Sequence, residues 1–254
     1  MLWSLILISL IITQLLSAGR GETQLAHNLR QAAVAETIAD SAVQDTIFRL
    51  LTSPEPPGAG GPRILVMPDG SARISFRDTA GMINPNIAPE PLLSALLQSC
   101  GASAGLAAQL TQSITDWRSP ANDMRPLITA YRAAGLAYAP QGQPFQSPDE
   151  IRLVLGMKPG LAACLVPQLS VYADQEIPLL MVAGPLVRTT LLRMMRDTGE
   201  ALPMAPPDRQ GARVVEITAQ GESRGARFTR RAIVRLGGSD PVTPYRILTW
   251  QDGN

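Results

Sequence analysis

The sequence contains few of the side chains from which catalytic sites and metal centres are usually built. Its 254 residues include one histidine, two cysteines and only 4% aromatic residues. The histidine, His27, falls in an N-terminal helical pattern where no pocket is expected, so a Ser-His-Asp or Cys-His arrangement has no suitable base. The spacings CxxC and HExxH are absent as well. We therefore predict that the protein is not an enzyme.

Carboxylates are the remaining candidates for acid–base chemistry, namely Asp116, Asp123, Asp149 and Glu150. Asp149 and Glu150 follow Ser147-Pro148, which is typical of the first turn of a helix, where the helix dipole stabilises negative charge. Asp116 is best interpreted as a residue that caps a helix end or pairs with an arginine.

The charge balance is nearly even. There are 22 basic and 21 acidic residues, with a formal net charge of +1, and Lys158 is the only lysine. Such a balance creates no general positive field that would attract nucleic acid.

The N-terminus is the most apolar part of the chain, because residues 1–19 carry no charged side chain. A helix rises about 1.5 Å per residue and a full span takes about 20 residues, so this length predicts a transmembrane anchor. Apolar spacing continues to Leu51, which predicts one helix over residues 1–52. The alternative is a signal peptide cleaved after Ser17-Ala18-Gly19, but no basic residue precedes its apolar core.

Two separate stretches read as strands of one antiparallel sheet. Residues 63–80 predict a hairpin with a turn at Pro68-Asp69-Gly70, in which apolar and polar residues alternate. Residues 207–254 predict three more strands, with a turn at 221–223 and an exposed row formed by Arg227, Arg231 and Arg235.

The intervening residues 81–206 have helical patterns. They predict helices after Pro89, after a Ser103 N-cap, over about 127–134, from a capping box at 147–150 to Gly156, over 160–166 and over about 186–196. The predicted fold class is therefore α+β: a long N-terminal helix packs on an antiparallel sheet, and an all-helical domain is inserted between the strands.

Cys100 and Cys164 both lie in the predicted insertion. In an oxidising compartment they can form a disulfide that closes a loop of about 64 residues. The alternative is a pair of buried thiols that act as small hydrophobic residues.

Several short motifs follow one another in a characteristic order. They are GMINPN at 81–86, ITDW at 114–117, AYRAAG at 130–135, QPFQSPDEI at 143–151, VLGM at 154–157, PQLSVY at 167–172 and the closing LTW at 248–250. Together with the N-terminal helix they resemble the minor pseudopilin K family of type II secretion systems, also called general secretion pathway protein K. The resemblance covers nearly the whole chain.

This resemblance implies a pilin-like helix and sheet with an inserted helical domain. It implies a non-enzymatic subunit that caps the tip of a periplasmic pseudopilus, in complex with other minor pseudopilins. It also implies a single pass through the bacterial inner membrane by residues 1–19, with the chain after about residue 20 in the periplasm.

Two departures from the family pattern affect processing and metal binding. Pilin-like precursors carry a short basic leader, and we expect the printed start to omit it. The family's insertion binds calcium, but here only Asp116, Asp123 and the amide of Asn122 are near the Asp-Trp motif, and Arg118 and Arg125 intrude. Because Ca²⁺ takes six to eight oxygen ligands, we expect no strong calcium dependence, with a residual site at Asp116 and Asp123 as the alternative.

Two other functional interpretations stay open. Asn84-Pro85-Asn86 and the segment 156–160 are similar to helix-hairpin-helix modules, which would suggest a membrane-anchored DNA-binding protein of a pilus or uptake machine. Pro159 removes one backbone donor there, and no basic cluster surrounds Lys158, so no nucleic acid is expected. The other interpretation is an anchored periplasmic protein that does not assemble.

Overall fold

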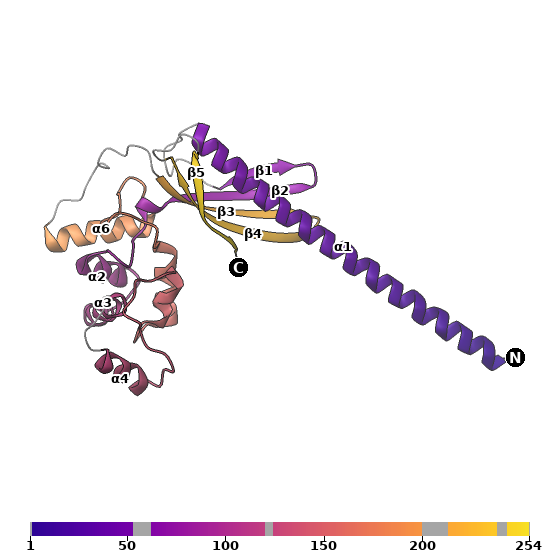
Figure 1. The fold of residues 1–254 in the computed structure, drawn as a ribbon, viewed down its shortest axis with the longest axis horizontal. Coiled ribbons are helices and arrows are strands. Elements are labelled where there is room, and N and C mark those ends of the chain that lie inside the picture. Colours follow the sequence, from indigo (N-terminus) through magenta and orange to yellow (C-terminus); the bar gives the residue numbers. More distant parts are fainter. Residues whose placement is uncertain (1, 53–61, 120–123, 200–212, 238–242, 254) are drawn as a thin grey trace. The chain divides into compact units, whose positions relative to one another are not determined.

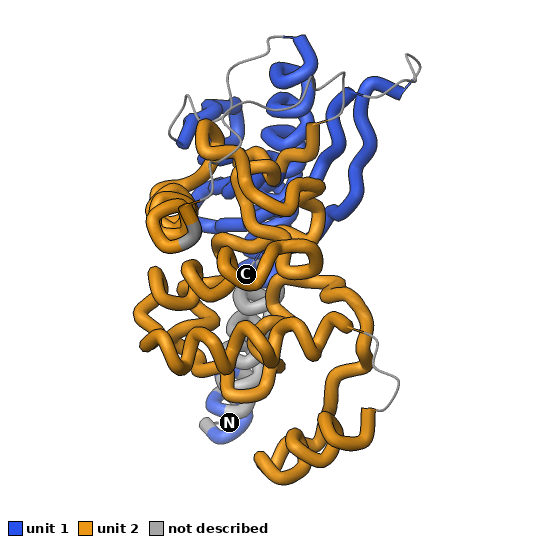
Figure 2. The backbone as a smooth tube through the Cα atoms, turned by 90° about the vertical axis from the view of Figure 1, so that its left-hand side faces the viewer, with its two compact units in different colours: residues 1–76, 216–254 blue, residues 77–215 orange. Residues whose placement is uncertain are grey.

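The computed structural model describes residues 2–52, 62–119, 124–199, 213–237 and 243–253. Before Gln24, only the side chains of Trp3, Ser4, Ile6 and Ser9 belong to the described part. The chain forms two compact units, which Figure 2 colours separately: residues 1–76 with 216–254, and residues 77–215. The predicted insertion, residues 81–206, lies within the second unit.

The first unit consists of a long helix and most of a sheet. Its elements are α1 (Leu2–Thr52), β1 (Arg63–Met67), β2 (Gly70–Asp78), β3 (Arg213–Ser223), β4 (Ala226–Leu236) and β5 (Tyr245–Asp252). In the described part of the chain these strands form one sheet in the order β1-β2-β3-β4-β5, and α1 crosses it (Figure 1). The pairs β1–β2 and β4–β5 are antiparallel. The predicted α+β class is confirmed.

One stripe of α1 faces the sheet and begins at Gln31. The buried positions recur every three or four residues, as expected for one face of a helix. They are Gln31, Ala35, Ile38, Ala39, Ala42, Val43, Thr46, Ile47 and Leu50. Leu25 and Leu29, which belong to the apolar spacing of this segment, are 60% and 62% exposed, so the buried stripe starts later than the apolar pattern.

The backbones of α1 and β3 approach each other closely at Gly221. A Cβ atom added to Gly221 would lie 2.2 Å from the carbonyl oxygen of Ala35 and 2.9 Å from the amide nitrogen of Ala39. The position therefore requires glycine for space.

The inward face of β4 carries a charged residue that the sequence pattern did not reveal. Arg230 is 6% exposed and lies between Phe228 and Ala232 on this face. Its guanidinium pairs with Glu36 (2.8 Å) and Asp40 (2.6 Å) of α1 and with Asp252 of β5. It also lies over the rings of Phe228 and Trp250, 4.7 and 5.3 Å from their centroids. By contrast, the predicted exposed row of Arg227, Arg231 and Arg235 is confirmed.

The predicted turn at 221–223 is wrong, because β3 continues through these residues. The strand instead ends at Ser223, and the chain turns at Arg224 and Gly225, whose φ values are 45° and 88°. Two consecutive positive φ values are typical of the tight turns whose twist matches a β-hairpin.

The second unit is built from short helices. They are η1 (Thr79–Gly81), α2 (Glu90–Ser99), α3 (Ala104–Arg118), α4 (Arg125–Ala133), η2 (Pro148–Leu153), α5 (Pro159–Leu165), η3 (Val166–Gln168) and α6 (Pro185–Thr198). Five of the predicted helices are confirmed as α-helices. The predicted Ser147 N-cap is confirmed, because its hydroxyl accepts a hydrogen bond from the amide of Asp149. The predicted helix to Gly156 is wrong, because η2 is a 3₁₀ helix that ends at Leu153. The capping box is not closed either, since Glu150 accepts a hydrogen bond from the amide of Gln146 rather than that of Ser147.

The predicted membrane anchor falls mostly outside the described side chains. Within the described residues, no helix combines the length and apolarity needed to cross a membrane. Most side chains of residues 1–19 lie outside that description.

We predict that Gly221→Ala lowers the free energy of unfolding by about 1–3 kcal/mol, because the added Cβ atom forces α1 and β3 apart. Urea denaturation of the full chain in detergent measures this. Gly105→Ala is the matched control, since a Cβ atom there has nothing within 4 Å and alanine favours the helix. Equal stability of the two variants would contradict the close approach.

Candidate functional site

The Asp-Trp motif lies at the end of α3, in the core of the second unit. Ser103 caps the start of this helix, where its hydroxyl accepts a hydrogen bond from the amide of Leu106 at 3.4 Å. Trp117, 8% exposed, stacks on Phe145, with ring centroids 5.8 Å apart and planes 8° apart. The ring of Tyr131 from α4 is 6.2 Å away. The tryptophan therefore anchors the segment that follows α4.

Tyr131 acts as a buried structural residue. It is 1% exposed, and its hydroxyl oxygen accepts a hydrogen bond from the amide of Leu155 at 2.9 Å. Burial raises the pKa of Tyr131 to about 12. The phenol is therefore neutral at physiological pH and is unsuited to proton transfer there.

The two asparagines of the 84–86 segment hold distant loops together. The amide nitrogen of Asn84 donates to the carbonyls of Val171 (3.3 Å) and Ala173 (2.7 Å). Asn86 pairs with the backbone of Phe145, accepting from its N–H at 2.7 Å and donating to its carbonyl at 3.0 Å. These groups are engaged within the protein, which accounts for the motif without a nucleic acid.

Arg118 binds the other side of the same segment. Its guanidinium donates to the carbonyl oxygens of Pro85 (2.6 Å) and Ala88 (3.1 and 3.2 Å). Burial lowers the pKa of Arg118, and the nearby charge of Glu90 acts in the opposite direction. Arg118 thus supplies a cation that satisfies carbonyl groups before α2.

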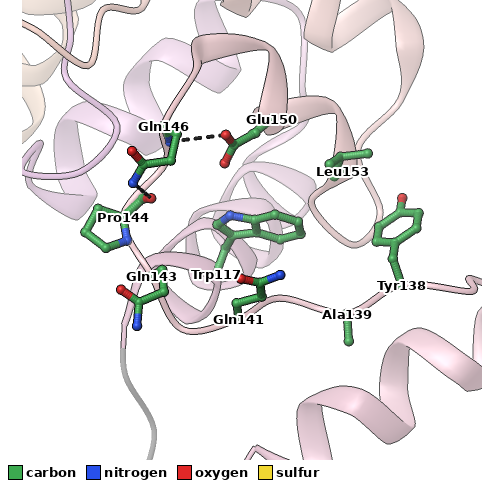
Figure 3. A pocket seen from close by; sticks show the side chains of 9 residues that line it. All are labelled: Trp117, Tyr138, Ala139, Gln141, Gln143, Pro144, Gln146, Glu150 and Leu153. Atoms are coloured by element: carbon green, nitrogen blue, oxygen red, sulfur yellow. Dashed lines mark hydrogen bonds between the residues drawn. The ribbon is translucent and has the colours of Figure 1, made fainter.

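A cavity of about 450 Å³ lies beside Trp117 (Figure 3). Its lining comprises Trp117, Tyr138, Ala139, Gln141, Gln143, Pro144, Gln146, Glu150 and Leu153. Among the described residues of this lining, Glu150 is the only acidic side chain, and histidine, cysteine, lysine and arginine are absent. These described residues do not bring together a general acid and a general base of the usual types.

A family model described as type II secretion system (T2SS), protein K, matches residues 79–174. Residues 79–174 are therefore similar to type II secretion system protein K over about a third of the chain. The sequence resemblance is confirmed for this segment. Over 94 residues, the chain is 31% identical to type II secretion system protein K of Klebsiella pneumoniae; the alignment covers 35% of this chain but only 28% of that relative. Type II secretion systems belong to the bacterial envelope.

The fold is also shared with a solved structure. One chain of the GspK–GspI–GspJ complex from the type 2 secretion system of enterotoxigenic Escherichia coli matches with a TM-score of 0.64. The match covers 93% of this chain and 99% of that chain, at 17% sequence identity. At this identity the likeness establishes the fold, including the helix and sheet that lie outside the family model.

The predicted metal residues are only partly described. Asp116 accepts a hydrogen bond from the side-chain amide of Gln112 at 2.8 Å, and Asp123 lies outside the described residues. In the described part of the chain, no group of three histidine, cysteine, aspartate or glutamate residues is placed to hold a metal ion.

The structure joins the two cysteines in a disulfide. Cys100 caps the end of α2 and Cys164 lies in α5, 64 residues further along the chain. The bond links α2 and α5. Both helices contribute to the same apolar core, α2 through Leu96 and α5 through Leu165.

Sequence reasoning missed Arg118 and Tyr131 as structural residues of this region. From the sequence, Arg118 was interpreted only as a charge that would oppose a metal ion. One signal could have identified its structural role. Residues 85–89 precede helix α2 and include Pro85 and Pro89, which have no N–H group, so the carbonyl groups of this segment need a donor from elsewhere.

We predict that intact-protein mass spectrometry after alkylation finds no free thiol before reduction and two after it. On the chain-entropy model a loop of this length contributes about 4 kcal/mol, so the double variant Cys100→Ser/Cys164→Ser should melt well below the parent. Two alkylated thiols in the unreduced protein would refute the bond.

We also predict that calcium changes the melting temperature by less than about 2 °C. A site filled at 100 times its Kd would stabilise the fold by about 2.7 kcal/mol, which corresponds to roughly 5–10 °C at this size. Differential scanning fluorimetry in millimolar CaCl₂ and in EGTA tests this, with Asp116→Asn as the control variant. A large rise that Asp116→Asn abolishes would establish a calcium site.

Proposed function

We propose that this protein is a minor pseudopilin of a type II secretion system, which caps the pseudopilus tip in complex with other minor pseudopilins. The observation that carries the proposal is the position of the protein K segment: residues 79–174 lie between β2 and β3 of a sheet on which a long helix packs. The fold match extends this arrangement to 93% of the chain.

The proposed partners are the host's proteins that correspond to GspI and GspJ. The solved structure with the matching fold is a complex of GspK with these two proteins. A tip subunit acts through the surfaces that it presents to its partners. This agrees with the finding that the side chains of Asn84, Asn86 and Arg118 form hydrogen bonds within the protein and so have a structural role.

The proposed location is the inner membrane, crossed once by residues 1–19, with the rest of the chain in the periplasm. The support is the sequence itself, which has no charge before Arg20. The disulfide between Cys100 and Cys164 also suits an oxidising compartment.

We predict that the full chain, extracted in detergent after co-expression with these two proteins, co-purifies with both in a fixed ratio. Size-exclusion chromatography with light scattering measures the mass of the complex. In the host, deletion of this gene should abolish export of the secretion system's substrates. A chain that elutes alone, in a host whose secretion is unaffected by the deletion, would contradict the proposal.

A further inference from the structure

Strand β1 is one of the two edges of the sheet, and its outer side presents backbone groups that pair with no described residue. Met67 pairs with Gly70 across a two-residue turn, so these two residues exchange both hydrogen bonds. Hydrogen-bonded and non-hydrogen-bonded residue pairs alternate along an antiparallel ladder. Ile64 and Val66 therefore form no backbone hydrogen bonds with the residues opposite them on β2. The N–H and C=O groups of Ile64 and Val66 therefore point away from β2, toward the open edge.

The side chains of the same two residues are exposed. Ile64 is 60% and Val66 80% exposed, although both are β-branched apolar residues. Their cross-strand neighbours on β2 are Arg73 and Ser71. The open edge thus combines free hydrogen-bonding groups with an apolar strip, which is the combination that strand addition uses.

Arg73 gives this edge a positive charge that the sheet does not neutralise. The acidic side chains on the same face of β3 are engaged elsewhere: Glu216 pairs with Arg231 at 3.2 Å, and Glu222 with Arg227 at 3.3 Å. Arg73 is exposed and makes no hydrogen bond or ion pair with the described residues.

The opposite edge, β5, is protected against strand addition. It carries exposed Arg246, Gln251 and Asp252, and its pairing with β4 has a register shift at Ile233/Val234. Charged residues and bulges on edge strands prevent natural sheets from pairing with a further strand. Strand β1 has no bulge, and its one charged residue, Arg63, is held by Asp45 at 2.5 Å.

We propose that an extended segment of a partner minor pseudopilin adds to the β1 edge as a sixth strand. Its backbone pairs with Ile64 and Val66, its apolar side chains cover theirs, and an acidic residue pairs with Arg73. A second copy of this chain fits less well, because it would bring another Arg73 to the same edge. This inference rests on the proposed function.

The experiment uses the full chain co-expressed with the host's GspI-like and GspJ-like proteins in detergent. Val66→Pro removes only the outward N–H, which an edge strand tolerates, and should weaken association at least about tenfold. Ile64→Thr and Arg73→Glu test the apolar strip and the charge without a proline. Arg235→Glu is the matched control, an exposed arginine on β4 whose reversal should leave association unchanged.

The outcomes separate this inference from the proposed function. Circular dichroism and melting temperature first establish that each variant is folded. If the parent binds its partners and Val66→Pro and Arg73→Glu bind equally well, the β1 edge is not the docking strand, and the proposed function stands. If the parent binds no partner, both fall. A homodimer that Val66→Pro disrupts would assign the edge to a second copy and overturn the hetero-partner.

Discussion

The close approach of α1 to the sheet is the contact on which the first unit depends. Ala35, Ala39 and Ala42 are fully buried, and Gly221 of β3 lies against the backbone of Ala35 and Ala39. Small residues on both sides let the two backbones meet, so dispersion contacts replace long side chains. The same contact fixes the rotation of the helix about its axis. A rotation by one residue position would carry Glu36 toward the sheet, where its charge would be buried.

That fixed rotation explains how a guanidinium can be buried at Arg230. The inward face of β4 is otherwise apolar, and an unpaired charge there would be strongly unfavourable. Glu36 and Asp40 lie one turn apart on α1 and reach Arg230 from the helix, while Asp252 reaches it from β5. A buried ion pair adds little net stability, so its value is positional: the charges can be satisfied in only one register of α1 on the sheet.

The sequence was informative where structure is decided locally and failed where it is decided by distant contacts. Ser103 marks the start of α3 through its own side chain, so that helix was predictable. The turn predicted at 221–223 has the composition of a loop, but Gly221 is there because of α1, which is far away in the chain. Arg230 was overlooked because alternation alone cannot show three carboxylates around a position. Asn86 was recognised as part of a motif, yet its partner Phe145 lies 59 residues away.

Distant contacts also determine the role of the 84–86 segment. Asparagine, proline and a following helix are equally consistent with a phosphate-binding hairpin and with a segment that holds other loops of the protein in place. Both use amide hydrogen bonds. The difference lies in where the donors and acceptors go. Here Asn84 binds Ala173, 89 residues away, and Arg118 binds the carbonyls of Pro85 and Ala88. The guanidinium of Arg118 lies beside these oxygens, so a metal cation brought to them would meet a like charge.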